Sequence, residues 1–173
     1  NSLNIVRMAG FVAPITIKTA IDKIDNNDYL IPAIQRKFVW KSYQIEVLFD
    51  SIMRGYPINS FMFWEIKDAS IKDNFKFYSF LTQFVQFHQA DNIPRNTVGG
   101  FKDFCAIIDG QQRLTSLYIG LRGSYAYKTP NARWEYSEKN FPTRHLYLNL
   151  ASPLPIDNER KMVYDFRFLT KDE

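Results

Sequence analysis

Cysteine is the scarcest reactive residue in this sequence, and its scarcity excludes two kinds of structure. Cys105 is the single cysteine among 173 residues, so the chain has no internal disulfide and no cysteine-based metal cluster. A chain of this length buries roughly 70% of the surface that its unfolded form exposes, so it needs no disulfide to fold. We therefore expect a cytoplasmic protein in which Cys105 lies inert in the core.

Long apolar runs are absent as well. A membrane-spanning helix needs about 18 consecutive apolar residues, and the nearest candidate, residues 11–17, is interrupted by Pro14 and Thr16. The chain starts at Asn1, without the basic and apolar segments of a signal peptide. We interpret it as a piece of a longer protein, with no membrane partner and with a single domain over residues 1–173.

Histidine is rare, whereas basic and aromatic residues are plentiful. His88 and His145 have neither metal-site spacing nor companion cysteines, which argues against a zinc site. Lys and Arg number 22 against 18 Asp and Glu, for a formal net charge of +4, and 16% of the residues are aromatic. The basic residues are scattered, so the charge is compatible with contact to nucleic acid and equally with an ordinary solvated surface.

The spacing of apolar residues predicts a mixed α+β protein of the α/β class. The predicted helices are residues 16–26, a second with Ser42 as N-cap and Gly55 as its stop, and a third from Gln111 to a cap at Gly123. The predicted strands are residues 29–32, 61–66 and 104–108, the last two buried, and an antiparallel pair within residues 145–169. Residues 68–102 are interpreted as an insertion, in which Phe77 fits a helix and a strand equally well.

The strand at residues 104–108 runs into a glycine and then into a helix, and this junction suits an anion. The N–H groups at a helix N-terminus lack partners and lie at the positive end of the helix dipole. Gly110 lets the backbone approach a phosphate closely, and Arg113 offers a planar fork of donors to two phosphate oxygens.

The polar residues beside Gly110 leave several roles open. Gln111 and Gln112 carry neutral amides that can orient a water or a base edge. Asp109 is consistent with a magnesium ligand, a general base or the N-cap of the helix. A capped helix with a polar first turn, without any ligand, explains these residues equally well.

Four motifs occur in order along the chain. They are residues 31–40 (IPAIQRKFVW), 50–58 (DSIMRGYPI), 61–64 (FMFW) and 108–115 (IDGQQRLT). Together they resemble the N-terminal domain of the GmrSD-type restriction endonuclease family, whose signature is DGQQR. The resemblance covers about residues 28–123 and extends less specifically to Tyr147 and residues 166–169. It implies a fold similar to ParB and sulfiredoxin, with a small mixed sheet flanked by helices.

The resemblance also implies a function. Family members bind and hydrolyse nucleoside triphosphates with Mg²⁺, and this activity gates a nuclease directed at modified foreign DNA, a form of phage defence. The motifs carry over a catalytic set that consists of Asp109, Gln111, Gln112 and Arg113. Asp109 would also be the metal ligand. They also imply nucleotide contacts by Gln35, Arg36, Gly110 and Arg113. Trp40 is expected to pack beneath this pocket.

The sequence departs from related folds in ways that limit the function. Sulfiredoxin relatives carry a Cys-His pair where this chain has Gln111 and Gln112, so cysteine redox chemistry is not expected. The family's C-terminal HNH-type nuclease domain is not in this chain, so DNA is expected as a partner of the full-length protein. Two alternatives stay open. One is a ParB-like DNA-binding domain with a non-hydrolysing pocket. The other is a docking platform in which the Phe-rich residues 75–87 pack against the nuclease domain.

Two expectations follow for the geometry and for variants. If the pocket is composite, the side chains of Gln35 and Arg36 converge on Arg113. We expect Arg113→Ala to weaken nucleotide binding with little loss of stability, because ligand and water would satisfy the guanidinium. Leu117→Ala, one turn along the helix, should instead cost stability through lost burial and a cavity.

Overall fold

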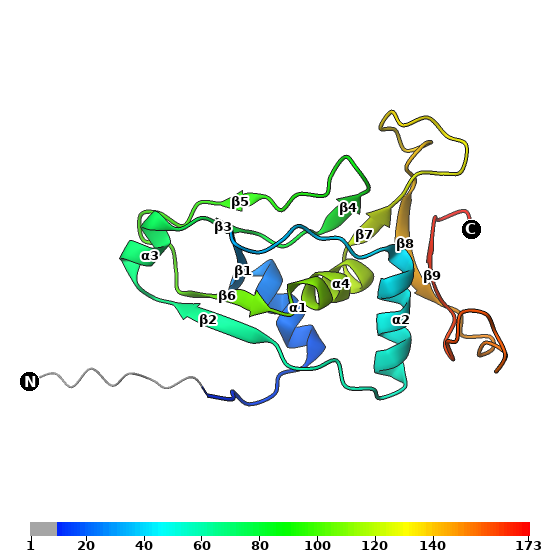
Figure 1. The fold of residues 1–173 in the computed structure, drawn as a ribbon, viewed down its shortest axis with the longest axis horizontal. Helices are drawn as coiled ribbons and strands as arrows, with labels where there is room; N and C mark the ends of the chain where they lie inside the picture. The colour runs from blue at the N-terminus through cyan, green and yellow to red at the C-terminus, as the bar shows by residue number, and fades with distance from the viewer. Residues whose placement is uncertain (1–9) are drawn as a thin grey trace, which may run out of the picture.

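The computed structural model describes residues 10–173, so residues 1–9 of the predicted domain lie outside the description. The helices in Figure 1 are α1 (Ile17–Asp25), α2 (Ser42–Met53), α3 (Ala69–Asn74) and α4 (Gln111–Leu121). The strands are β1 (Tyr29–Pro32), β2 (Met62–Ile66), β3 (Phe77–Tyr78), β4 (Gln83–Val85), β5 (Pro94–Arg95), β6 (Phe104–Asp109), β7 (Ser124–Ala126), β8 (Thr143–Leu148) and β9 (Phe166–Leu169). The predicted mixed α+β class is confirmed, and within residues 10–173 no helix combines the length and apolar character needed to cross a membrane.

The strands form two mixed sheets rather than the one small sheet that was expected. Among the described residues, one sheet has the order β2-β6-β1-β3-β5 and the other has the order β4-β7-β8-β9. In each sheet one pair is parallel, β1 with β6 and β4 with β7. Residues 68–102 supply strands to both sheets, and Phe77 lies in β3 instead of a helix. The predicted C-terminal pair forms as antiparallel β8 and β9.

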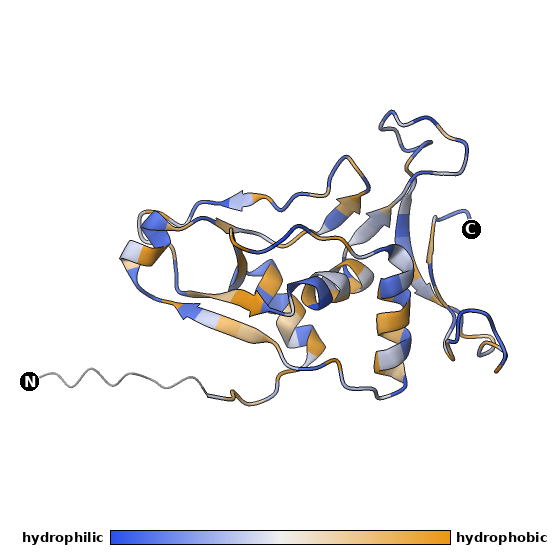
Figure 2. Cartoon of the chain, viewed as in Figure 1, coloured by the Kyte–Doolittle hydropathy of each residue, from blue (hydrophilic) through white to orange (hydrophobic). Residues whose placement is uncertain are grey.

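Helix α4 lies between the two sheets at the centre of the molecule (Figure 1). Leu114, Leu117 and Ile119 are buried in the main hydrophobic core, together with residues of α1, α2 and both sheets. The start of the same helix is hydrophilic, whereas the strand that leads into it is largely apolar (Figure 2). The fold therefore places the polar first turn of α4 at the end of a largely buried strand.

Strand β2 is an edge strand, although its apolar sequence predicted burial. It pairs only with β6 in the order of the first sheet, and Met62 and Trp64 are exposed. Ile66 is the residue of β2 that is buried. An edge strand has a neighbour on one side only, so an apolar composition by itself does not determine its burial. Strand β6 is central, as predicted.

Two predicted helix caps lie one residue away from those in the structure. The N-cap of α2 is Lys41, whose N–H donates to Gln44 Oε1 at 2.9 Å, and Ser42 is the first helical residue. The C-cap of α4 is Arg122. Gly123 follows it and donates its N–H to the carbonyl of Tyr118 at 3.0 Å. Close packing also requires this glycine, because a Cβ there would overlap the carbonyl oxygen of Thr82.

Candidate functional site

The turn between β6 and α4 has a conformation that requires glycine. Gly110 is the N-cap of α4 with a left-handed φ of 91°, which excludes Asp109 from that role. A Cβ on Gly110 would overlap the Phe61 ring and would lie 3.2 Å from a guanidinium nitrogen of Arg113. The space that glycine leaves is therefore filled by Phe61, not kept open for a phosphate as the sequence suggested. No described side chain caps α4, so the first N–H groups of this helix stay available to a ligand.

A pocket of about 220 Å³ opens at this turn. Its lining residues come from the β1–α2 loop and from the start of α4, and they are Gln35, Arg36, Trp40, Asp109, Gly110, Gln111, Gln112 and Arg113. The structure thus brings together every residue that the two Gln-Arg motifs predicted. Gln35 and Arg36 line the same pocket as Arg113. Trp40 also packs against the core beneath the pocket.

Gln111 differs from every other residue of the pocket. Its side chain is buried, with the residue only 4% exposed, and within residues 10–173 neither its Nε2 nor its Oε1 has a hydrogen-bond partner. A buried, unpartnered polar group typically costs about 1–3 kcal/mol. Such a group is typically satisfied by a ligand or a water, so Gln111 is the candidate in this pocket for contact with a polar partner.

The neighbouring amides of Gln112 and Gln35 are engaged with the backbone. Gln112 Oε1 accepts from the N–H of Val39, and its Nε2 donates to the carbonyl of Lys37, both at 3.0 Å. Gln35 Nε2 donates to the carbonyl of Ile108 at 2.7 Å. These bonds fasten the β1–α2 loop to the β6–α4 junction, so both glutamines shape the pocket by holding its two walls together.

Arg113 is bonded within the protein rather than left free for a ligand. Its guanidinium donates to the carbonyls of Ile58 and Ser60, the latter at 3.1 Å, and pairs with Asp109 at 3.3 Å. It also lies over the Phe61 ring, 4.9 Å from the ring centroid. Arg113 therefore anchors the α2–β2 loop at the pocket, and the premise that only ligand and water would satisfy its guanidinium is wrong.

This geometry gives a revised prediction for Arg113→Ala. We expect the free energy of unfolding to fall by about 1–3 kcal/mol, because two backbone carbonyls lose their donors. Thermal and chemical denaturation measure this loss, with Lys67→Ala as a control, since Lys67 forms an exposed ion pair with Glu65. An Arg113→Ala variant as stable as the control would contradict the anchoring role.

Arg36 and Asp109 are the exposed charges of the pocket. Arg36 has no carboxylate partner among the described residues, whereas its neighbour Lys37 pairs with Asp91 at 2.7 Å. The Asp109 side chain is 71% exposed, and its one partner in the described part of the chain is Arg113. Residues 10–173 contain no group of three potential metal ligands. A single carboxylate fits Mg²⁺ that is held mainly by the phosphates of a nucleotide, and it does not fit a protein-built metal cage.

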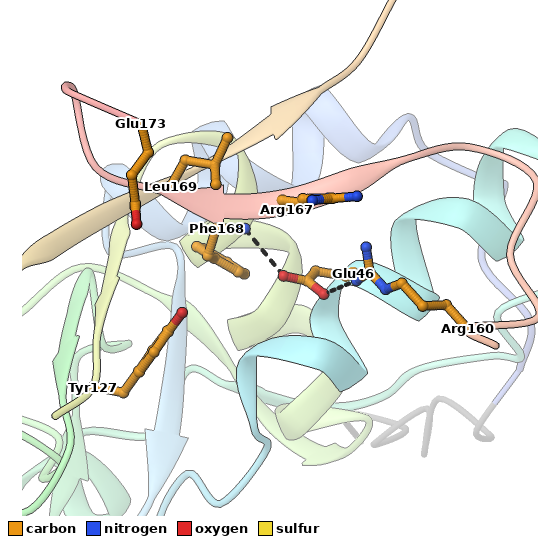
Figure 3. Close-up of a pocket in the computed structure, with 7 residues that line it drawn as sticks. All are labelled: Glu46, Tyr127, Arg160, Arg167, Phe168, Leu169 and Glu173. Carbon is orange, nitrogen blue, oxygen red and sulfur yellow. Dashed lines mark hydrogen bonds and ion pairs between the residues drawn. The ribbon is translucent and has the colours of Figure 1, made fainter. Parts of the chain in front are cut away.

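Sequence reasoning missed a second polar cluster, at α2 and the C-terminal segment. Glu46 and Asp50 are buried although both are acidic. Figure 3 shows Glu46 pointing from α2 toward β9, where it accepts from the N–H of Phe168 at 3.0 Å and pairs with Arg160. A cavity of about 360 Å³ lies beside it. The signal in the sequence was an acidic pair spaced four residues apart within the apolar stripe of α2.

Cys105 behaves as predicted. Burial raises the pKa of its thiol, because desolvation disfavours the thiolate. The thiol is free and half-buried in β6, where it pairs across to β2 and β1. A thiol with a raised pKa is a poor nucleophile at neutral pH, so Cys105 is part of the packing of the sheet.

The comparison with known proteins supports the family resemblance. No curated protein matches this chain. A family model described as the N-terminal domain of GmrSD restriction endonuclease matches residues 17–170. The match spans all of the helices and strands described above, and it includes both walls of the pocket. The chain therefore belongs to the family of GmrSD restriction endonuclease N-terminal domains.

Proposed function

We propose that this domain binds and hydrolyses a nucleoside triphosphate at the start of α4, as the regulatory part of a phage-defence restriction endonuclease that acts on modified DNA. The buried, unpartnered amide of Gln111 at an uncapped helix N-terminus carries the proposal. A phosphate there would receive hydrogen bonds from the first N–H groups of α4 and would lie at the positive end of its dipole.

Some of the pocket residues would contact the nucleotide, and the others hold the walls of the pocket in place. Arg36 offers a guanidinium that forms no ion pair with any described residue, and Gln111 offers a buried amide donor. Asp109 would hold Mg²⁺, which supplies charge neutralisation at the phosphates when it is bound. Gln35, Gln112 and Arg113 keep the two loops in place. Hydrolysis would draw on positioning and charge stabilisation, which are the main sources of catalysis in phosphoryl transfer.

Arg36→Ala tests the nucleotide contact. Because Arg36 is exposed and forms no ion pair, we expect an unchanged melting temperature and roughly a tenfold loss of nucleotide affinity. The measurement is calorimetric titration of ATP, GTP, UTP and CTP with MgCl₂ at one fixed salt concentration. Lys37→Ala is the matched control, since it removes an adjacent charge that does not line the pocket. Equal affinities for the two variants, or no binding by the wild-type domain, would refute the proposal.

The docking-platform alternative receives less support from the core. Of the Phe-rich residues 75–87, Phe77, Phe80 and Phe84 are buried within this domain, whereas Phe75 and Phe87 are exposed. We propose contact with DNA, and with a C-terminal HNH-type nuclease domain, for the full-length protein and not for the Phe-rich segment of this domain. A ParB-like DNA-binding role for the domain alone predicts DNA affinity that falls steeply with salt, which a binding isotherm at two salt concentrations measures.

A further inference from the structure

Buried polar side-chain atoms without partners are concentrated on one helix. In residues 10–173 these atoms are Gln111 Nε2, Gln111 Oε1, Thr115 Oγ1 and Ser116 Oγ, and all of them belong to α4. Buried polar groups elsewhere have partners, such as the Asp50 carboxylate and the Lys72 ammonium. Because orphaned groups are costly, a cluster of them beside a pocket indicates a shared polar partner.

Thr115 lies one helical turn beyond Gln111, on the same face of α4. Thr115 is completely buried, whereas Gln111 lines the pocket. Residues four apart on a helix have Cβ atoms about 5–6 Å from each other, a separation at which one water can bridge two polar side chains. Ser116 points in a different direction, because it is five residues from Gln111 on a helix with about 3.6 residues per turn.

The chemistry of the ligand fixes how the Gln111 amide must be turned. Phosphate oxygens accept hydrogen bonds and, when ionised, donate none, so Nε2 must face the ligand. Oε1 then faces the protein interior, where it needs a donor. A water that donates to Oε1 can in turn accept from the Thr115 hydroxyl, which gives both orphaned groups a partner.

We propose that Thr115 is a positioning residue of the nucleotide pocket, which orients the Gln111 carboxamide through one shared buried water so that Nε2 faces the phosphate. The proposal rests on the proposed nucleotide-binding function. Thr115 does not itself touch the ligand. Its hydroxyl selects one of the two amide orientations, and it therefore adjusts affinity for the phosphate from one turn inside the helix.

Three variants of α4 test the proposal. Thr115→Val keeps the shape of the side chain but removes the hydroxyl, so we expect a loss of nucleotide affinity of about fivefold. Thr115→Ser keeps a hydroxyl and should retain the affinity. Ser116→Ala, at an equally buried but differently directed hydroxyl, should leave the affinity unchanged.

The outcomes separate this proposal from the function on which it rests. If the wild-type domain binds MgATP, MgGTP, MgUTP or MgCTP and Thr115→Val binds equally well, the positioning role is refuted while nucleotide binding stands. The role is refuted too if Thr115→Ser loses as much affinity as Thr115→Val, since packing would then explain both. If the wild-type domain binds none of these nucleotides, both proposals fail.

Discussion

Gln111→Met and Gln112→Met are expected to give opposite results, although the two glutamines are adjacent. Methionine has nearly the length and volume of glutamine and lacks its amide. At position 111 it removes a buried amide that has no internal partner, so we expect a ligand-free melting temperature no lower than that of the wild type. Nucleotide affinity should fall roughly 10–100-fold, because a buried donor to a charged phosphate is lost.

Gln112→Met should instead lower stability. It leaves the N–H of Val39 and the carbonyl of Lys37 without the bonds that hold the β1–α2 loop. We expect a loss of about 2–4 kcal/mol in the free energy of unfolding, from two backbone groups that lose a partner. Urea denaturation and nucleotide titration on both variants make the comparison. A Gln111→Met variant that is destabilised as much as Gln112→Met would show that both amides are structural.

The β6–α4 junction could be predicted from the sequence because its signals are local. An apolar run, a glycine and a helical repeat lie within residues 104–123, and each is determined by neighbours in the chain. The apolar repeat also predicted the burial of Leu117. The pocket as a whole was reached through the resemblance, since its other wall, at Gln35 and Arg36, lies far away in the sequence.

The division of roles within the pocket could not be predicted, because it depends on long-range contacts. Gln111 and Gln112 have the same chemistry, and only the position of the β1–α2 loop leaves one amide free and occupies the other. The sequence indicates that Arg113 is available to a phosphate, because the carbonyls of Ile58 and Ser60 that accept from it lie more than 50 residues away in the chain. The exposure of β2 likewise follows from its place at the edge of the sheet.

Asp50→Ala is expected to give the largest loss of stability. Asp50 is 2% exposed, and its Oδ1 accepts from the N–H groups of Val163 and Tyr164, both at 2.8 Å. Its Oδ2 pairs with Arg54 at 3.3 Å. Alanine leaves two backbone donors unpaired and opens a cavity at the contact between α2 and the C-terminal segment. We expect the free energy of unfolding to fall by about 3–5 kcal/mol in urea denaturation.

Asp50→Asn separates the hydrogen bonds of this carboxylate from its charge. Asparagine keeps an oxygen that can accept from both N–H groups, so it should retain roughly half of the stability that alanine loses. Glu65→Ala is the control, because Glu65 forms an exposed ion pair with Lys67 and should change stability by less than about 1 kcal/mol. Nucleotide affinity of the folded Asp50→Asn variant should match the wild type, since Asp50 does not line the pocket.

An Asp50→Ala variant no less stable than Glu65→Ala would contradict the role of the buried carboxylate. It would mean that the C-terminal segment is held by its apolar contacts, such as those of Met162 and Phe166.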